Sequence, residues 1–178
     1  PLSASGKPLY NHHNFDAWWG SHWSLDILWS MAYPHLMDDF CNTMLDMYRN
    51  GGLIPRGPSG GNYTYVMIGD PAVSFFATAY NKGIRNYDAD LAYEGLRKNA
   101  FPGGIRDHAG YEHSKDAHSG GMEYYIKMGY VPDGRANVVG MHTTGASMTL
   151  EYAYQDWCLA QMAKAMGKQA DYELFFER

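Results

Sequence analysis

The sequence predicts an all-α fold. Apolar residues recur at helical spacing along most of the 178 residues, and glycine or proline marks the ends of these segments. No segment alternates convincingly between apolar and polar residues, although residues 62–67 (NYTYVM) are compatible with a short strand. Short glycine turns alternate with long loops. This alternation favours a stack or ring of helical hairpins that carries its long loops at one end.

The first two predicted helices follow each other closely in the chain. Asp16 is the expected N-cap of a helix through residues 17–33, and Pro34 stops it. Residues 34–50 form the second helix, which places apolar side chains on one face and ends at Gly51. We therefore expect an N-terminal hairpin with a tight turn.

The later helices have equally clear boundaries. Asp70 is the expected N-cap of the third helix, with Pro71 at its first position and Gly83 at its end. The remaining predicted helices are residues 88–101 capped by Asp88, a short helix ending at Gly129, residues 145–167, and a last helix that starts at its cap Asp171.

The loop LIPRGPSGGNYTYVMIGD, residues 53–70, is too long for a simple helix connection of about two to eight residues. Its GPSGG segment does not match a phosphate-binding loop, because no lysine follows the glycines and no strand precedes them. Its glycines allow close approach of a ligand, and Asn62 and Tyr63 offer hydrogen bonds and a stacking face. We interpret this loop as one wall of a binding pocket.

Composition excludes several classes of partner. The net charge is -5 and no basic stripe is present, which argues against nucleic acid as the main partner. No apolar run reaches the roughly 18 residues of a membrane span, and the polar N-terminal stretch carries no signal peptide. Fifteen Tyr, five Trp and seven Phe exceed what a core needs, which indicates a sugar or another ring-shaped ligand.

Cysteines and histidines give weaker indications. Cys41 and Cys158 lie in different predicted helices, and buried free thiols are the favoured interpretation. His108, His113 and His118 are spaced by five residues in a loop, whereas two zinc ligands on a helix are spaced by four. Convergence of these three on a metal remains the less favoured alternative to ordinary surface histidines.

The carboxylates form no convincing acid/base couple. Glu151 and Asp156 share a predicted helix, but five residues place them about 140° apart. Asp26 stands in a strongly apolar segment and needs a partner, either as a structural hydrogen-bond hub or as a ligand of sugar hydroxyls. On the predicted helix Trp19 and Trp23 share a face, so core packing and cavity lining both remain open for the tryptophans.

Two long stretches resemble glycoside hydrolase family 92, the calcium-dependent exo-acting α-mannosidases. They are IPRGPSGGNYTYVMIGD with the following AYNKGIRNYDADLAYEGLRKNA, and TLEYAYQDWCLAQMAKAMGK. The resemblance implies an (α/α)6 helical toroid, preceded in complete members by a β-rich domain. It also implies inverting release of terminal mannose, with calcium gripping two sugar hydroxyls through hard oxygen ligands.

The resemblance further implies that the catalytic acid and base lie outside this chain. The family motifs that carry them, of the types TEGNAWQY and GNEDxGQMSAW, do not occur here. We therefore expect residues 1–178 to be about half of the toroid, with the β-rich domain, the second half of the toroid and most calcium ligands elsewhere in the polypeptide. Expected partners are an α-mannoside glycan and the rest of the polypeptide. The expected location is secreted or periplasmic, in a bacterium.

Eight residues are expected to wall the sugar pocket rather than catalyse: Trp18, Trp19, Trp23, Asp26, Arg56, Asn62, Tyr63 and Asp70. Asp70 has a structural alternative as an N-cap, Arg56 as a bridge to a neighbouring carboxylate, and Glu151 is interpreted as a packing and hydrogen-bonding residue. Pro71 stands where many relatives have a histidine, and no arginine follows Asp26. These departures indicate a branch of the family with altered substrate contacts, and α-1,2 is the expected linkage. The alternatives are a non-catalytic carbohydrate-binding helical domain and a helical scaffold.

Overall fold

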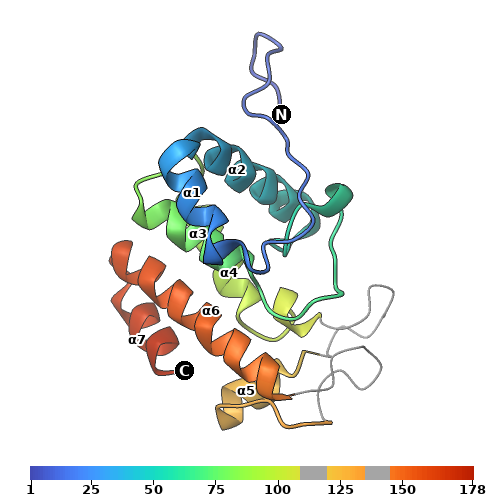
Figure 1. Ribbon diagram of the computed structural model, residues 1–178, viewed down its shortest axis with the longest axis vertical. Helices are drawn as coiled ribbons and strands as arrows, with labels where there is room; N and C mark the ends of the chain where they lie inside the picture. Colours follow the sequence, from blue (N-terminus) through green and yellow to red (C-terminus); the bar gives the residue numbers. More distant parts are fainter. Residues whose placement is uncertain (109–119, 135–144) are drawn as a thin grey trace.

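The computed structural model of the chain describes residues 1–108, 120–134 and 145–178, and the regular elements in these ranges are all helical (Figure 1). The α-helices are α1 Leu25–Ala32, α2 Pro34–Gly51, α3 Ala72–Asn81, α4 Ala89–Asn99, α5 Met122–Met128, α6 Gly145–Ala165 and α7 Gln169–Glu177. Three short 3-10 turns are η1 Ser21–Trp23, η2 Ser59–Gly61 and η3 Ile105–Asp107. The prediction of an all-α fold is confirmed.

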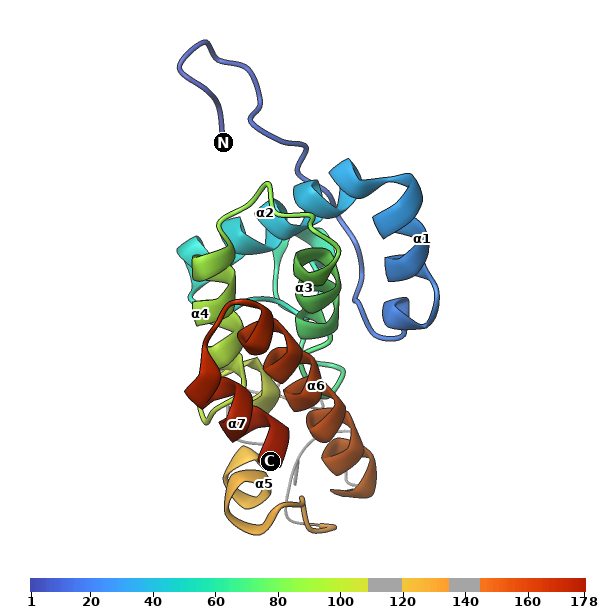
Figure 2. The same cartoon turned by 90° about the vertical axis from the view of Figure 1, so that its left-hand side faces the viewer.

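Helix α6 is the axis of the arrangement. It packs against α7 on one side and α3 on the other, and α5 lies near its first turns (Figures 1 and 2). Helices α1 and α2 form the first predicted hairpin, and α3 leads into α4 as the second. The N-terminal arm leaves this body and extends beyond α2 (Figure 1).

Most predicted boundaries are confirmed by cap geometry. The Asp88 carboxylate accepts a hydrogen bond from the Leu91 amide at 3.0 Å, as an N-cap does. Helix α2 begins at Pro34 and is followed by Gly52 at φ 82°, one residue beyond the expected Gly51. Helix α5 ends before Gly129 at φ 78°. A backbone conformation that suits glycine therefore ends both helices.

The first predicted helix is wrong over residues 17–24, about half of its length. Regular α-helix begins only at Leu25, and Asp16 caps nothing there. Gly20 adopts φ 79°, and the Trp18 amide donates to the Arg56 carbonyl at 2.9 Å instead of to the Asp16 side chain that would cap a helix here. A tertiary hydrogen bond and a left-handed glycine thus override the helical pattern of this segment.

Three further expectations need correction. Helix α3 begins at Ala72, and the Asp70 side chain makes no capping hydrogen bond. Helix α7 begins at Gln169, so Asp171 lies in its first turn, where it accepts from Tyr93 and Arg97. Residues 62–67 form no strand in the described part of the chain. They run as bends and irregular backbone.

The main core lies among α2, α3, α4, α6 and α7. Trp18 belongs to this core: its ring stacks on those of Phe15 and Phe75, with ring centroids 4.5 Å and 4.2 Å away. Its indole N–H points to the Met44 sulfur at 2.9 Å. Cys41 and Cys158 are buried free thiols, as predicted.

Three long connections meet at one end of the bundle. A Cβ on Gly57 would lie 2.6 Å from the Ala17 Cα, so the segment before α1 runs directly against the 53–70 loop. Arg56 of that loop reaches the Ile105 carbonyl after α4. The prediction that long loops gather at one end is therefore confirmed for these described segments.

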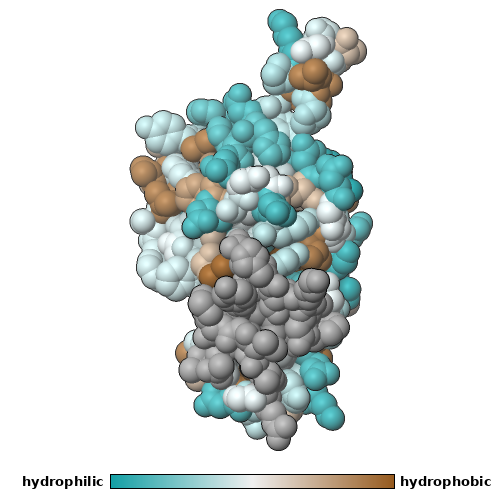
Figure 3. Space-filling model, turned by 90° about the vertical axis from the view of Figure 1, so that its right-hand side faces the viewer, coloured by the Kyte–Doolittle hydropathy of each residue, from teal (hydrophilic) through white to brown (hydrophobic). Residues whose placement is uncertain are grey.

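The surface carries no sign of a membrane-crossing helix: within the described ranges, none of the helices has the length and apolar character to span a bilayer. On the face shown in Figure 3, hydrophilic side chains predominate and hydrophobic ones form separate patches.

Candidate functional site

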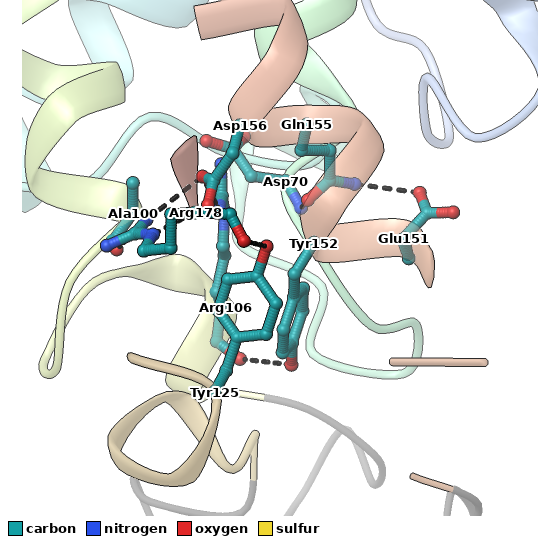
Figure 4. Close-up of polar contacts among 9 residues, drawn as sticks. All are labelled: Asp70, Ala100, Arg106, Tyr125, Glu151, Tyr152, Gln155, Asp156 and Arg178. Carbon is teal, nitrogen blue, oxygen red and sulfur yellow. Dashed lines mark hydrogen bonds and ion pairs between the residues drawn. The ribbon is translucent and has the colours of Figure 1, made fainter. Parts of the chain in front are cut away.

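A buried polar network underlies the loop end of the bundle (Figure 4). Charged side chains from the 53–70 loop, the segment after α4, α6 and the end of α7 converge there. The fully buried members are Arg56, Asp70, Arg106 and Asp156. Such a cluster needs internal partners, because buried charge without partners is strongly unfavourable.

Arg56 fixes the shape of the 53–70 loop. Its guanidinium donates to three backbone carbonyls: Gly69 at 2.7 Å, Thr64 at 3.1 Å and Ile105 at 2.7 Å. Burial lowers the pKa of Arg56 to about 10, so it remains charged at neutral pH. Arg56 therefore binds carbonyls where a bridge to a carboxylate was predicted. It is fully buried and holds the loop backbone in place, so its side chain does not line an exposed surface.

Asp156 is the anion at the centre of the network. One of its oxygens accepts from Arg106 Nη1 at 2.5 Å, and the other accepts from Arg178 Nε at 2.7 Å. Burial alone would raise the pKa of Asp156, but the two arginines together lower it. This carboxylate is therefore ionised and fully engaged.

Asp70 differs sharply from Asp156. It is fully buried at the end of the 53–70 loop, and neither of its oxygens has a hydrogen-bond partner among the described residues. Burial raises the pKa of Asp70 to about 6, although the charge of Arg106 partly offsets this rise. Nε and Nη2 of Arg106 are also unpaired in this part of the chain.

Gln155 of α6 ties the loop to a second carboxylate. Its side-chain oxygen accepts from the Asp70 amide at 2.6 Å, and its NH₂ group donates to Glu151 at 2.7 Å. Gly69, at φ 77°, lets the backbone approach this pair, since a Cβ there would lie 2.5 Å from Gln155 Nε2. Glu151 is thus a hydrogen-bonding residue of the long helix, as predicted.

Asp26 is buried, and its carboxylate forms no hydrogen bond within the described ranges. It lies in the first turn of α1 and is 1% exposed, and both its oxygens and the Ser21 hydroxyl are unpaired within the described ranges. Burial raises the pKa of Asp26 to about 6, and the nearby Ser21 moderates the rise. It does not face solvent, so the structure gives it no exposed ligand-binding role.

The predicted tryptophans divide between core and surface. Trp18 is completely buried, whereas Trp19 is 55% and Trp23 is 69% exposed. The ring centroids of Trp19 and Trp23 lie 5.8 Å apart. The His22 ring lies between this pair and α6, with its centroid 5.8 Å from that of Trp23 and 4.8 Å from that of Tyr154. We call Trp19, His22, Trp23 and Tyr154 the aromatic platform.

Tyr63 and Asn62 stay local to the loop. The Tyr63 hydroxyl lies 2.9 Å from the Met47 carbonyl and 2.8 Å from the Leu53 carbonyl, which share its single hydrogen, and it accepts from the Leu53 amide at 3.2 Å. The Asn62 side-chain oxygen accepts from the Tyr63 amide at 2.8 Å, and the residue is exposed. Tyr63 is therefore a staple between the loop and the end of α2, with its polar end engaged.

Sequence reasoning missed four participants: His22 and Tyr154 of the platform, and Arg106 and Gln155 of the network. The available signal was the helical spacing of Glu151, Tyr154 and Gln155, which places the first beside both others on α6. Nothing in the sequence pairs Arg106 with Asp156, which lie 50 residues apart. His113 and His118 of the histidine loop lie outside the described residues.

A calcium ion does not fit the described donors. No group of three or more His, Cys, Asp or Glu side chains assembles within residues 1–108, 120–134 and 145–178. Calcium takes six to eight oxygen ligands. No chemical step is therefore assigned to a metal held by the described residues.

The described residues form a helical domain in which long loops meet at one end and the rings of Trp19 and Trp23 are exposed. The model of the glycosyl hydrolase family 92 catalytic domain matches residues 3–178. The chain belongs to this family.

Relatives and solved structures agree with this assignment. A protein described as an uncharacterized secreted glycosidase, from Arthroderma benhamiae, is 30% identical over 154 residues, which are 85% of this chain and 19% of that protein. The structure of a family GH92 inverting mannosidase from Bacteroides thetaiotaomicron superposes with a TM-score of 0.74 at 26% identity, over 99% of this chain and 24% of that one.

A second α-mannosidase of the family from the same bacterium gives a TM-score of 0.70 at 29% identity, over 92% of this chain and 20% of that protein. It is also known in complex with mannoimidazole. The chain thus spans about a fifth to a quarter of the length of these relatives.

Proposed function

We propose that the chain is part of an inverting exo-α-mannosidase that removes terminal mannose from α-mannoside glycans, with α-1,2 linkages as the expected substrate. The family match over residues 3–178 carries this proposal. The solved neighbours are mannosidases, and one of them binds mannoimidazole. Function is taken from the family and the site together, since a fold alone does not determine an activity.

The described residues are proposed to bind and position rather than to catalyse. An inverting glycosidase needs two carboxyl groups about 6.5–9.5 Å apart with room for a water molecule. Asp156 is engaged by two arginines, and Asp26 and Asp70 are buried away from solvent. This supports an acid/base pair supplied elsewhere in the polypeptide, with the 53–70 loop as part of the pocket.

Calcium assistance is also part of the proposal, with ligands mostly outside these residues. Removal of calcium from the complete protein by a chelator should abolish hydrolysis of an aryl α-mannoside, and added calcium should restore it. Full activity after thorough chelation would contradict the calcium requirement while leaving the glycosidase assignment intact.

The activity is tested directly on the complete polypeptide that contains this chain. Hydrolysis of an aryl α-mannoside, followed by NMR of the first-formed anomer, should show release of β-mannose, as inversion requires. α-1,2-, α-1,3- and α-1,6-linked mannobiose then rank the linkages. Release of α-mannose would exclude inversion, and absence of hydrolysis of every α-mannoside would exclude the activity.

A non-catalytic carbohydrate-binding role is the second candidate, and the exposed aromatic platform favours it. It predicts binding of methyl α-mannoside without hydrolysis by the complete protein. Calorimetric titration combined with the hydrolysis assay separates the two candidates.

The rest of the polypeptide is the proposed partner of the exposed apolar face of α1, which includes Ile27, Leu28 and Met31. Exposed apolar side chains grouped in this way are typical of a surface that is covered in the complete protein. A secreted or periplasmic, bacterial origin is proposed on the label of the secreted relative and on the bacterial neighbours.

A further inference from the structure

Glu151 occupies the boundary between the buried network and the exposed platform. It lies on α6 one turn before Tyr154, and the two side chains share a helix face. Tyr154 in turn packs on His22, which contacts Trp23. The carboxylate is therefore adjacent to the aromatic platform by direct helical geometry and ring contact.

The orientation of this carboxylate is set from the buried side. Within the described ranges, Gln155 is the one hydrogen-bond donor to Glu151, through Nε2 to Oε1 at 2.7 Å. Gln155 is itself 1% exposed and is anchored by the Asp70 amide at 2.6 Å. In Figure 4 the Glu151 carboxylate points away from Asp156 and Arg106. A fixed amide thus holds one oxygen of a half-buried acid.

We propose that Glu151 is a substrate-binding carboxylate that accepts hydrogen bonds from the hydroxyls of a sugar lying against the aromatic platform. The inference rests on the proposed function and deepens it by naming a specificity residue. Aromatic rings stack on the apolar C–H face of a sugar, while a carboxylate accepts bonds from its hydroxyls. Gln155 is the positioning residue, because it orients the acid without reaching the ligand.

Two features separate this role from simple packing. Burial raises the pKa of Glu151, so this carboxylate is partly desolvated beside the aromatic platform. Gly69 leaves room for the Glu151–Gln155 pair, since a Cβ at this position would also lie 2.9 Å from the Glu151 Cγ. The local backbone is therefore shaped around this side chain.

The test uses the complete protein and the variant Glu151→Gln, with Glu173→Gln as the matched control. Glu173 accepts a hydrogen bond from Gln169 on α7 at 2.7 Å, also between side chains four residues apart, but it is exposed and remote from the loop end. Thermal unfolding of both variants reports whether folding is preserved. Methyl α-mannoside is the binding probe, and an aryl α-mannoside is the substrate.

Glu151→Gln should weaken methyl α-mannoside binding and raise KM by about tenfold, since a hydrogen bond to a charged acceptor is lost, with kcat changed less than KM. Glu151→Asp should restore part of the affinity. Glu173→Gln should match the wild type in both constants. For monodeoxy mannosides, the variant should lose no further affinity at the hydroxyl that Glu151 binds.

Three outcomes distinguish the possibilities. Unchanged KM and binding in a folded Glu151→Gln protein would overturn the role of Glu151 while leaving the mannosidase activity established. A lower melting temperature with wild-type KM would assign Glu151 a purely structural role and also overturn the proposal. Failure of the wild type itself to bind or hydrolyse α-mannosides would instead contradict the proposed function.

Discussion

Asp156 and Asp70 are both fully buried and both feel the charge of Arg106, but their electrostatic situations are opposite. Asp156 accepts hydrogen bonds from Arg106 and Arg178, and its pKa is lowered. Asp70 has neither partner at hydrogen-bond distance, and its pKa is raised to about 6. The difference shows that a nearby buried cation lowers the pKa of a carboxylate below its usual value only where hydrogen bonds join the two groups, as Arg106 and Arg178 do with Asp156.

The comparison gives opposite pH dependences. Asp156 is stabilised when ionised, so its contribution is present above the unfolded-state pKa of about 3.9 and is lost as the pH falls below it. Asp70 binds its proton more tightly in the folded state. Its contribution is therefore greatest below about pH 4 and is lost as the pH rises through about 6.

Removing the charge of Asp156, which pairs with two arginines, has the largest expected effect on stability. Asp156→Asn should lower the free energy of unfolding by about 3–5 kcal/mol at pH 7, because Arg106 and Arg178 would keep buried charge without an anion. Chemical denaturation measures this loss. The control Asp171→Asn, at the exposed Arg97 pair, should cost at most about 1 kcal/mol. Equal losses in the two variants would contradict the assigned importance of the buried network.

Replacing the unpaired carboxylate of Asp70 by a neutral amide should change the pH dependence of the free energy of unfolding in the opposite direction. Asp70→Asn should remove the part of the decline in stability between about pH 4 and pH 6 that Asp70 causes, while Asp26, whose pKa is also raised to about 6, keeps its own part. Relative to the wild type, the variant should therefore gain up to about 3 kcal/mol more at pH 7 than at pH 4. Unfolding curves collected across this range check the slope. A wild-type stability that rises with pH over the same interval, with no change in the variant, would disprove the raised pKa.

Arg56 tests how the network shapes the loop above it. Arg56→Lys should cost about 2 kcal/mol, since a lysine cannot donate to Gly69, Thr64 and Ile105 together and leaves buried carbonyls unpaired. Limited proteolysis should show faster cleavage within residues 57–69. Arg85→Lys, at an exposed carbonyl contact, is the control and should cleave at the wild-type rate. Unchanged cleavage in Arg56→Lys would indicate that the loop is held by other contacts.

Gly69 gives the smallest and finest test. Gly69→Ala and Gly83→Ala both place a side chain at positive φ, at 77° and 81°, but only the former Cβ meets Gln155 and Glu151. Each should lose about 1 kcal/mol through backbone strain. Gly69→Ala should lose roughly 1 kcal/mol more through the close contact, as measured by thermal unfolding. Equal losses would show that the Gln155 contact yields without cost.

Local features of the sequence predicted much of the fold. Asp88, Pro34 and Gly129 mark helix ends in the structure because capping and left-handed glycine depend on neighbouring residues alone. The same reasoning failed for residues 17–24. There a hydrogen bond from Trp18 to the distant Arg56 determines the backbone, and no local pattern reports such a contact.

The candidate site was predicted less completely, and the reason is burial. Trp18 and Trp19 are adjacent residues of the same type, yet Trp18 is in the core and Trp19 is exposed. Arg56 and Asp70 were correctly associated with the loop, but the structure places both beneath it. The role of Arg56 and Asp70 as substrate contacts stays a prediction. The aromatic platform beside Glu151 is more exposed to solvent than these two buried residues.

By itself the sequence determined the all-helical class, most helix boundaries and the family, because periodicity, caps and long motifs are local in the chain. Only the tertiary structure decided which polar groups pair: Arg106 meets Asp156 across 50 residues, and the Asp70 amide meets Gln155 across 85. These pairings depend on how helices pack, and packing is set by the fit of the whole core rather than by any one segment.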